Sequence, residues 1–132
     1  MQADVLVLDM ADHEALEKTL ADLPAFDVVV NSAGMARHGP ALETRPEDFD
    51  AVIDLNFRAA YFLAALAAGR LTAEGKPGSI INISSQMGHV GGIDRAVYSA
   101  SKHAIEGMTK SMAIEWGPKG IRINSICPTF IR

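Results

Sequence analysis

The chain has 132 residues, of which 48% are hydrophobic and 21% are charged, so it holds enough apolar material for one core and too little length for two ordinary domains. Its formal net charge of −4 argues against nucleic acid or an anionic membrane as the principal partner. The longest apolar stretch, residues 59–68, is about half of a bilayer span, and the start of the chain lacks the basic flank of a secretory signal. We therefore expect a cytoplasmic protein. The single cysteine, Cys127, excludes an internal disulfide and has no histidine or second thiol at metal-ligand spacing, so we predict no metal site.

The first elements alternate between strand and helix patterns. Residues 4–9 form a continuous aliphatic run, which predicts a strand covered on both faces. Asp12 can cap a helix that continues to about Asp22. Residues 26–31 predict a second strand, which ends in the turn-forming residues 31–34.

A long helix follows in the sequence pattern. The run Thr44-Arg-Pro-Glu47 matches a capping box and predicts the start of a helix that ends near Thr72. Apolar residues occupy most faces of its alanine-rich second half, so we expect this helix to be covered by the sheet and by another subunit.

The remainder repeats the alternation. Residues 79–85 predict a third strand, residues 86–94 a glycine-containing loop, residues 96–116 a helix and residues 121–126 a fourth strand. Four strands separated by three helices predict an α/β fold: a doubly wound, Rossmann-like parallel sheet with helices on both faces. We interpret residues 1–132 as a partial dinucleotide-binding and catalytic domain. It lacks the first βαβ unit with its glycine-rich phosphate turn, and it lacks the C-terminal substrate segment.

Tyr98 and Lys102 are the residues that first suggest chemistry. They stand four positions apart and so share one face of the helix predicted over residues 96–116. An ammonium group beside a phenol favours the phenolate and makes Tyr98 a proton-transfer group, while Ser85 offers a hydroxyl at the same edge of the sheet. Taken alone, the pair fits an ordinary exposed helical contact equally well.

Five motifs in one order strengthen the functional interpretation. The sequence resembles the short-chain dehydrogenase/reductase family, of the classical type, at Asn31-Ser-Ala-Gly34, Leu55-Asn56, Ile83-Ser-Ser85, Tyr98-Ser-Ala-Ser-Lys102 and Arg122-Ile-Asn-Ser-Ile-Cys-Pro128. The separation of 13 residues between positions 85 and 98 is similar to the family's spacing and selects Ser85 over Ser84. The resemblance covers essentially the whole chain. The loop that begins at Ser85-Gln86 resembles sugar and polyol members of the xylulose-reductase type.

The resemblance implies a role for each catalytic residue. Tyr98 would exchange a proton with the substrate, Ser85 would polarise the reacting oxygen and Lys102 would hold the nicotinamide ribose. Asn56 would anchor a water that connects Lys102 with solvent. For Asn56, a polar helix residue without a catalytic role is the alternative interpretation.

The resemblance also implies contacts to the cofactor and the substrate. The cofactor contacts would be Asp9, Met10, Asn31, Ser32, Ala33, Gly34, Tyr98, Lys102, Pro128, Thr129 and Ile131. The substrate contacts would be Ser85, Gln86, Met87, His89 and Tyr98, with Val90 and Arg95 as further candidates, although simple loop filling explains most of these equally well. Ser32 stands where the family commonly has Asn, and Thr129 stands where it commonly has Gly.

The leading hypothesis is an oxidoreductase that transfers a hydride between NAD or NADP and a secondary alcohol or ketone, such as a sugar or polyol. A catalytically incompetent folding or association unit is one alternative. A non-redox nucleotide-binding module is another, but it leaves Ser85, Tyr98 and Lys102 unexplained. The resemblance further implies a homodimer or homotetramer that pairs through the helices at 45–72 and 96–116.

Overall fold

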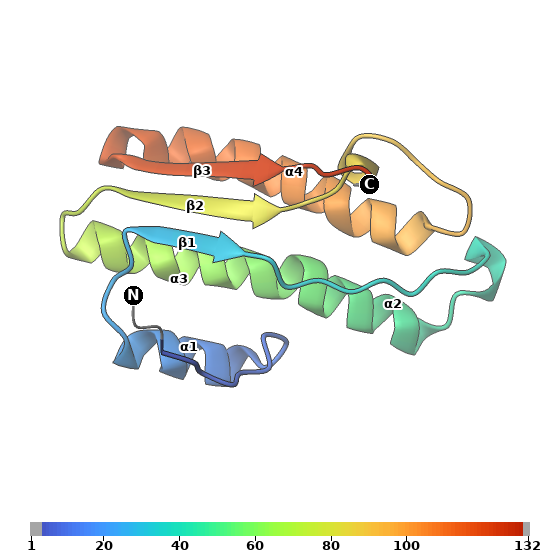
Figure 1. Ribbon diagram of the computed structural model, residues 1–132, viewed down its shortest axis with the longest axis horizontal. Helices are drawn as coiled ribbons and strands as arrows, with labels where there is room; N and C mark the ends of the chain where they lie inside the picture. The colour runs from blue at the N-terminus through green and yellow to red at the C-terminus, as the bar shows by residue number, and fades with distance from the viewer. Residues whose placement is uncertain (1–3, 131–132) are drawn as a thin grey trace.

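The computed structural model describes residues 4–130, which form a three-stranded parallel sheet covered by helices (Figure 1). The strand order is β1 (Val28–Asn31), β2 (Gly78–Ile83) and β3 (Ile121–Ile126), so neighbours in space are also neighbours in the chain. The register places Val29 beside Ile80 and Ile80 beside Ile123. The α/β class with a parallel sheet is therefore confirmed.

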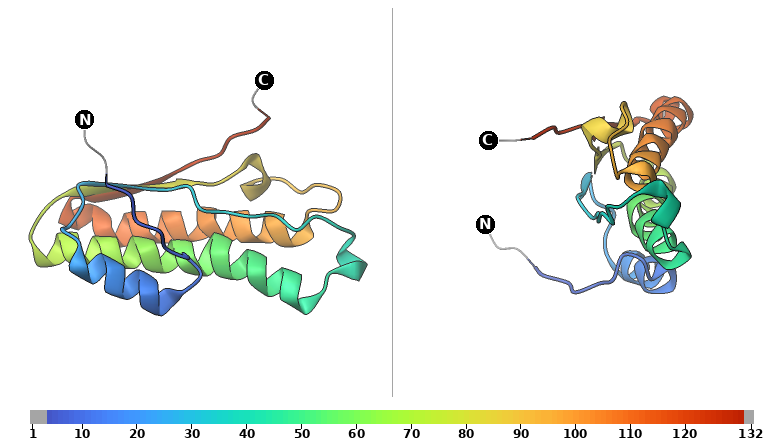
Figure 2. Two further views of the ribbon diagram at one scale, coloured as in Figure 1. Left: turned by 60° about the horizontal axis from the view of Figure 1, so that its bottom comes forward. Right: turned by 90° about the vertical axis from the view of Figure 1, so that its right-hand side faces the viewer.

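The helices α1 (His13–Asp22), α3 (Ala60–Ala73) and α4 (Ala96–Trp116) all lie on one side of the sheet (Figure 2). Both crossovers, from β1 to β2 and from β2 to β3, advance in the same direction across the sheet. Right-handed crossovers that advance in one direction place their helices on the same face. Within residues 4–130, the helices that we expected on both faces therefore cover only one.

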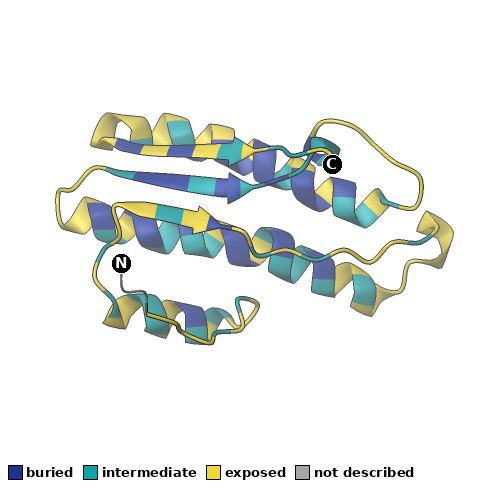
Figure 3. Ribbon diagram, in the orientation of Figure 1, coloured by how far each residue is buried: buried dark blue, intermediate teal, exposed yellow. Residues whose placement is uncertain are grey.

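The hydrophobic core lies between this face of the sheet and the helices α3 and α4 (Figure 3). Small side chains allow α3 to approach the strands closely, and its buried residues are Ala60, Ala64, Ala67, Ala68 and Leu71. Across from them lie Ile80, Ile121 and Ile123 of the sheet and Ile105 of α4. The 28-residue helical run Pro46–Ala73 is long and apolar enough to cross a membrane by length and composition alone, but part of its length forms this core.

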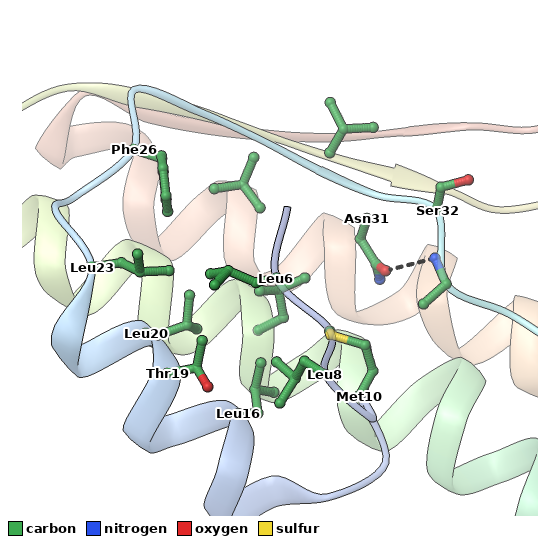
Figure 4. A pocket seen from close by; sticks show the side chains of 14 residues that line it. Leu6, Leu8, Met10, Leu16, Thr19, Leu20, Leu23, Phe26, Asn31 and Ser32 are labelled. Carbon is green, nitrogen blue, oxygen red and sulfur yellow. Dashed lines mark hydrogen bonds between the residues drawn. The ribbon is translucent and has the colours of Figure 1, made fainter. Parts of the chain in front are cut away.

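The strand predicted over residues 4–9 is wrong. The segment has no hydrogen-bonded strand partner among the described residues, and Val5 and Val7 are 86% and 100% exposed. An apolar hollow of about 420 Å³ separates it from β1 (Figure 4). The aliphatic run predicted burial on both faces, but none of residues 4–9 is buried, because a strand needs a neighbour to pair with. The helix start at Asp12 is confirmed, because its side chain accepts a hydrogen bond from the Ala15 amide at 3.0 Å.

The long central helix differs from its prediction in two ways. It begins as α2 (Pro46–Ile53), with Arg45 as the N-cap, and Thr44 makes no capping hydrogen bond. The capping-box prediction is wrong because proline occupies the first helical position and moves the cap one residue along the chain. The helix then passes through a π-helical turn, Asp54–Ala59, before it continues as α3. Hydrophobic periodicity gave no sign of this turn.

Candidate active site

Residues that follow the three strands meet the N-terminal half of α4 at the carboxyl edge of the sheet, as expected for a parallel α/β fold. Two neighbouring cavities open there. The first, of about 340 Å³, includes the predicted residues Ser32, Ala33, Gly34, Tyr98 and Lys102 in its lining. The second, of about 260 Å³, includes the predicted residues Ser85, Gln86, Met87, Tyr98, Pro128 and Thr129. Tyr98 lies on the boundary between the two cavities.

Ser84 and Ser85 point in different directions because successive side chains of an extended chain alternate. Ser84 is buried beside Glu106, although its Oγ makes no hydrogen bond of full geometry within the described residues. Ser85 lines the second cavity together with Tyr98. Its Oγ accepts a hydrogen bond from the Met87 amide at 3.1 Å and so begins the short 3-10 turn Gln86–Gly88. The Ser85 hydroxyl proton remains available for donation into the cavity.

Lys102 follows Tyr98 by one helical turn, and its Nζ lies 5.7 Å from the centre of the Tyr98 ring. The side chain is buried, and Nζ donates to the Ile83 carbonyl at 3.0 Å. Burial lowers the pKa of Lys102 below its ordinary value, while the nearby Cys127 and Glu106 oppose this shift by favouring the charged form. A desolvated amine is thus held beside the phenol.

Asn56 lies in the π-helical turn and is almost completely buried. Its Oδ1 accepts from the Met35 amide at 2.7 Å, and its Nδ2 donates to the Met35 carbonyl at 2.8 Å. Nδ2 also donates to Ser101 Oγ at 3.0 Å, and Ser101 in turn donates to the Tyr98 carbonyl at 2.7 Å. This chain of hydrogen bonds connects the loop after β1 with the helix that carries Tyr98.

Gly34 forms the wall of the first cavity next to Lys102. A Cβ atom at this position would lie 3.5 Å from Asn56 Oδ1 and 3.6 Å from Lys102 Nζ, so the glycine keeps the ammonium group open to the cavity. An ammonium donor and free backbone groups fit the ribose and carboxamide of a nicotinamide cofactor. Residues 4–130 contain no glycine-rich strand-to-helix turn of the kind that binds a pyrophosphate.

Other predicted site residues lie outside these two cavities. Asn31 and Met10 line the apolar hollow, and Asn31 Oδ1 accepts a hydrogen bond from the Ala33 amide at 3.2 Å (Figure 4). Asp9 is exposed and accepts from the Ala11 amide at 2.9 Å. His89 is turned toward Glu106, with 3.6 Å between Nε2 and Oε2. Ile131 lies outside the described residues.

Sequence reasoning missed His38, which lines the first cavity. The centroid of its ring lies 5.8 Å from that of Tyr98 in an edge-on arrangement, and its Nε2 lies 3.1 Å from Arg95 Nη1. His38 belongs to an irregular loop, so neither periodicity nor a motif marks it. Arg95, which was only a secondary candidate, lines both cavities.

A second polar cluster surrounds Glu106, on α4 one turn beyond Lys102. Glu106 accepts hydrogen bonds from Ser125 Oγ at 2.8 Å and from Cys127 Sγ at 3.3 Å. Burial by itself raises the pKa of Glu106, but the neighbouring serine hydroxyls, the Cys127 thiol and His89 outweigh it and lower the pKa overall. Burial and the adjacent carboxylate raise the pKa of Cys127. The Glu106, Cys127 and His89 ligand atoms lie within 4.8 Å of one another, a proximity that sequence spacing did not reveal.

Comparison with known proteins gives one family throughout. A family profile described as short chain dehydrogenase matches residues 1–132. Carbonyl reductase (NADPH) 2 of Sus scrofa is 40% identical over 124 residues, which cover 94% of this chain and 51% of the relative. L-xylulose reductase of Bos taurus is 38% identical over 128 residues, which cover 97% of this chain and 52% of the relative. The predicted similarity to enzymes of the xylulose-reductase type is confirmed.

Solved structures agree with this result. The structure of a 4-hydroxyisoleucine dehydrogenase complexed with NADH covers 95% of this chain with a TM-score of 0.91 and 37% identity. The match covers 57% of that protein. The chain thus spans about half the length of the curated relatives that it matches.

Proposed function

Because this chain belongs to the short-chain dehydrogenase family, we propose that the protein transfers a hydride between NAD or NADP and a secondary alcohol or ketone. The observation that carries the proposal is the shared location of Ser85, Tyr98 and Lys102 at the carboxyl edge of the sheet. A non-redox nucleotide-binding module would not need a phenol, an amine and a hydroxyl in this arrangement.

Each of the three side chains has a proposed task. Tyr98 gives a proton to the carbonyl oxygen during reduction and takes one from the alcohol during oxidation. The Lys102 charge, 5.7 Å from the phenol ring, favours the phenolate form. Ser85 donates its hydroxyl to the reacting oxygen, which develops negative charge during the reaction. The cofactor supplies or accepts the hydride.

The remaining assignments concern the cofactor and the architecture of the site. We propose that the backbone at residues 32–34 and the segment Pro128-Thr129 bind the nicotinamide half, with Lys102 on the ribose. Asn56 is proposed to anchor a water that connects Lys102 with solvent. Its three side-chain hydrogen bonds, to Met35 and Ser101, also make it a positioning residue. Asp9 and Met10 are proposed for the adenine half, and Ile131 for the carboxamide.

The proposed substrate is a small, polar alcohol or ketone such as a sugar or polyol. Ser85, Gln86 and Thr129 give the second cavity polar groups that can bind further hydroxyls of a substrate. The similarity to L-xylulose reductase supports a sugar-like compound. The similarity to 4-hydroxyisoleucine dehydrogenase favours a hydroxylated compound as well.

The test is Tyr98→Phe in the full-length protein, with Tyr61→Phe as the matched control because Tyr61 is the only other tyrosine. Removing the transferable proton should lower kcat about 100-fold or more while cofactor affinity changes less than about 3-fold. Tyr61→Phe should keep the wild-type rate. Turnover of Tyr98→Phe within a few fold of wild type would refute the proposed role.

We further propose a cytoplasmic homo-oligomer. A groove of about 330 Å³ runs between α3 and α4 and is lined by apolar side chains that include Tyr61, Met108 and Trp116. Tyr61 is 42% exposed there. Pairing of these helices across a two-fold axis would cover the groove. Sedimentation at micromolar concentration should show a dimer or tetramer, and a purely monomeric protein would contradict the proposal.

A further inference from the structure

We propose that Arg95 and His38 form a recognition site for an anionic group of the substrate, a carboxylate or a phosphate, next to Tyr98. The inference rests on the proposed function and narrows its substrate class to hydroxy acids, keto acids or phosphorylated alcohols. It follows from the positions of these two side chains, the charges around them, their hydrogen bonding and the connection between the loops that carry them.

The placement brings the two side chains to the reacting group. Arg95 immediately precedes α4 and lines both cavities, whereas His38 comes from the loop after β1 and lines the first. The His38 ring lies edge-on to the Tyr98 ring, with 5.8 Å between the ring centres. An anion bound by Arg95 would therefore sit on the same molecule whose hydroxyl or carbonyl reaches Tyr98.

The charge balance of the site favours an anion. Arg95 and Lys102 both line the first cavity, and no aspartate or glutamate lines either cavity. Among the described residues no carboxylate lies within 4.0 Å of Arg95, whereas Arg37 and Arg45 both pair with Asp48. In a chain with a net charge of −4, a cavity with two cations and no acidic group requires an explanation.

The hydrogen bonding of Arg95 leaves donors free. A guanidinium group only donates, so His38 Nε2 accepts from Arg95 Nη1 at 3.1 Å and the imidazole proton is on Nδ1. This contact occupies one N–H of the five in the guanidinium group. The remaining donors form a planar fork, which matches the two oxygens of a carboxylate or phosphate.

The loops that carry the two residues are connected to each other. The Gly39 amide donates to the Asp94 carbonyl at 3.0 Å, so the residue after His38 is bonded to the residue before Arg95. A Cβ atom at Gly92 would lie 3.0 Å from Arg95 Cδ and 3.3 Å from Met87 Sδ. The glycine therefore leaves room for the arginine stem, and the backbone hydrogen bond keeps the two loops side by side.

The first experiment compares matched acid and neutral substrates with the full-length protein and its cofactor. Gluconate is compared with sorbitol, and 3-hydroxybutyrate with 2-butanol, in wild type, Arg95→Gln and Arg95→Lys. Loss of a charged hydrogen bond in Arg95→Gln should lower kcat/KM for the acids about 10- to 100-fold, mostly by raising KM. The kcat/KM for the matched neutral substrates should change less than about 3-fold. For the acid substrates, kcat/KM of Arg95→Lys should lie between that of wild type and that of Arg95→Gln. Arg37→Gln, in the same loop as His38, is the control.

The second experiment does not depend on turnover. Succinate or inorganic phosphate at about 10 mM should raise the thermal midpoint of wild type and of Tyr98→Phe, but not that of Arg95→Gln. Equal stabilisation of Arg95→Gln would overturn the proposal. So would an Arg95→Gln variant that loses cofactor affinity while acids and neutral substrates are affected alike, because Arg95 would then serve the cofactor. If Tyr98→Phe keeps its turnover while anion binding depends on Arg95, the proposed role of Tyr98 fails and the anion site at Arg95 remains supported.

Discussion

Asn56 binds both backbone polar groups of Met35, accepting from the amide at 2.7 Å and donating to the carbonyl at 2.8 Å. The two residues are 21 positions apart in sequence, and the contact fixes the loop after β1 against the π-helical turn. Gly34 immediately precedes Met35, and His38 follows it by three residues in the same loop. The same contact therefore sets the position of the cavity wall that faces Tyr98.

Replacing Asn56 by alanine should therefore affect stability and activity together. The variant leaves the Met35 amide and carbonyl without their partner in a largely buried position, and we expect a loss of about 2–4 kcal/mol in the free energy of unfolding. Turnover should fall as well, because the cavity wall is no longer fixed. Urea unfolding of this variant is compared with that of Asn124→Ala, whose side chain is exposed on β3. A loss below about 0.5 kcal/mol would contradict the positioning role.

Gly88→Ala should disturb α4, the helix that carries Tyr98 and Lys102. A Cβ atom there would lie 3.0 Å from Glu106 Cγ and 3.1 Å from the Lys102 carbonyl oxygen. We expect a loss of about 1–3 kcal/mol in stability together with lower turnover, because the backbone of the lysine itself is pushed away. Gly91→Ala is the control, since nothing lies within 4 Å of a Cβ atom at that position. Equal behaviour of the two variants in unfolding and in turnover would show that the close approach is unimportant.

Glu106 should contribute to stability in a pH-dependent way. Its native pKa is lower than the ordinary value of 4.5, so the contribution is complete above that pH and is lost as the pH falls through the native pKa. Glu106→Gln should reduce the stability at pH 7 by about 1–3 kcal/mol and show a smaller further loss between pH 6 and pH 3 than wild type. The readout is the unfolding free energy at several pH values, with exposed Glu115→Gln on the same helix as the control. If the unfolding free energies of wild type and Glu106→Gln fell in parallel as the pH is lowered, this account would be refuted.

Cys127 should react slowly with alkylating agents at neutral pH. Burial and the adjacent Glu106 carboxylate raise the pKa of the thiol, and the thiolate is the reactive form. Glu106→Gln removes the neighbouring charge and should accelerate the modification by iodoacetamide, measured by intact mass over time. If wild-type Cys127 reacted as fast as glutathione, the raised pKa of the thiol would be contradicted.

The elements with strong local signals could be predicted from sequence. The third and fourth predicted strands and the helix over residues 96–116 are uninterrupted patterns bounded by glycine and proline, and their observed limits differ by two residues at most. The resemblance to the family selects Ser85, Tyr98 and Lys102, and the structure brings these three residues to the same edge of the sheet.

Features that depend on distant contacts could not be predicted. Whether residues 4–9 form a strand depends on a neighbouring strand, and nothing in the local sequence encodes one. His38 is placed by the hydrogen bond between the Gly39 amide and the Asp94 carbonyl, which joins two loops far apart in the chain. The capping box failed for a local reason, since Pro46 outweighs the hydrogen-bonding tendency of Thr44.

The π-helical turn Asp54–Ala59 makes the central helix a poor candidate for idealisation. A deletion of one residue, or a redesign that converted this stretch into a regular α-helix, would rotate Asn56 away from Met35. Substitutions that raise the thermal stability of this helix are therefore expected to lower the turnover rate. A designer should leave these six residues unchanged.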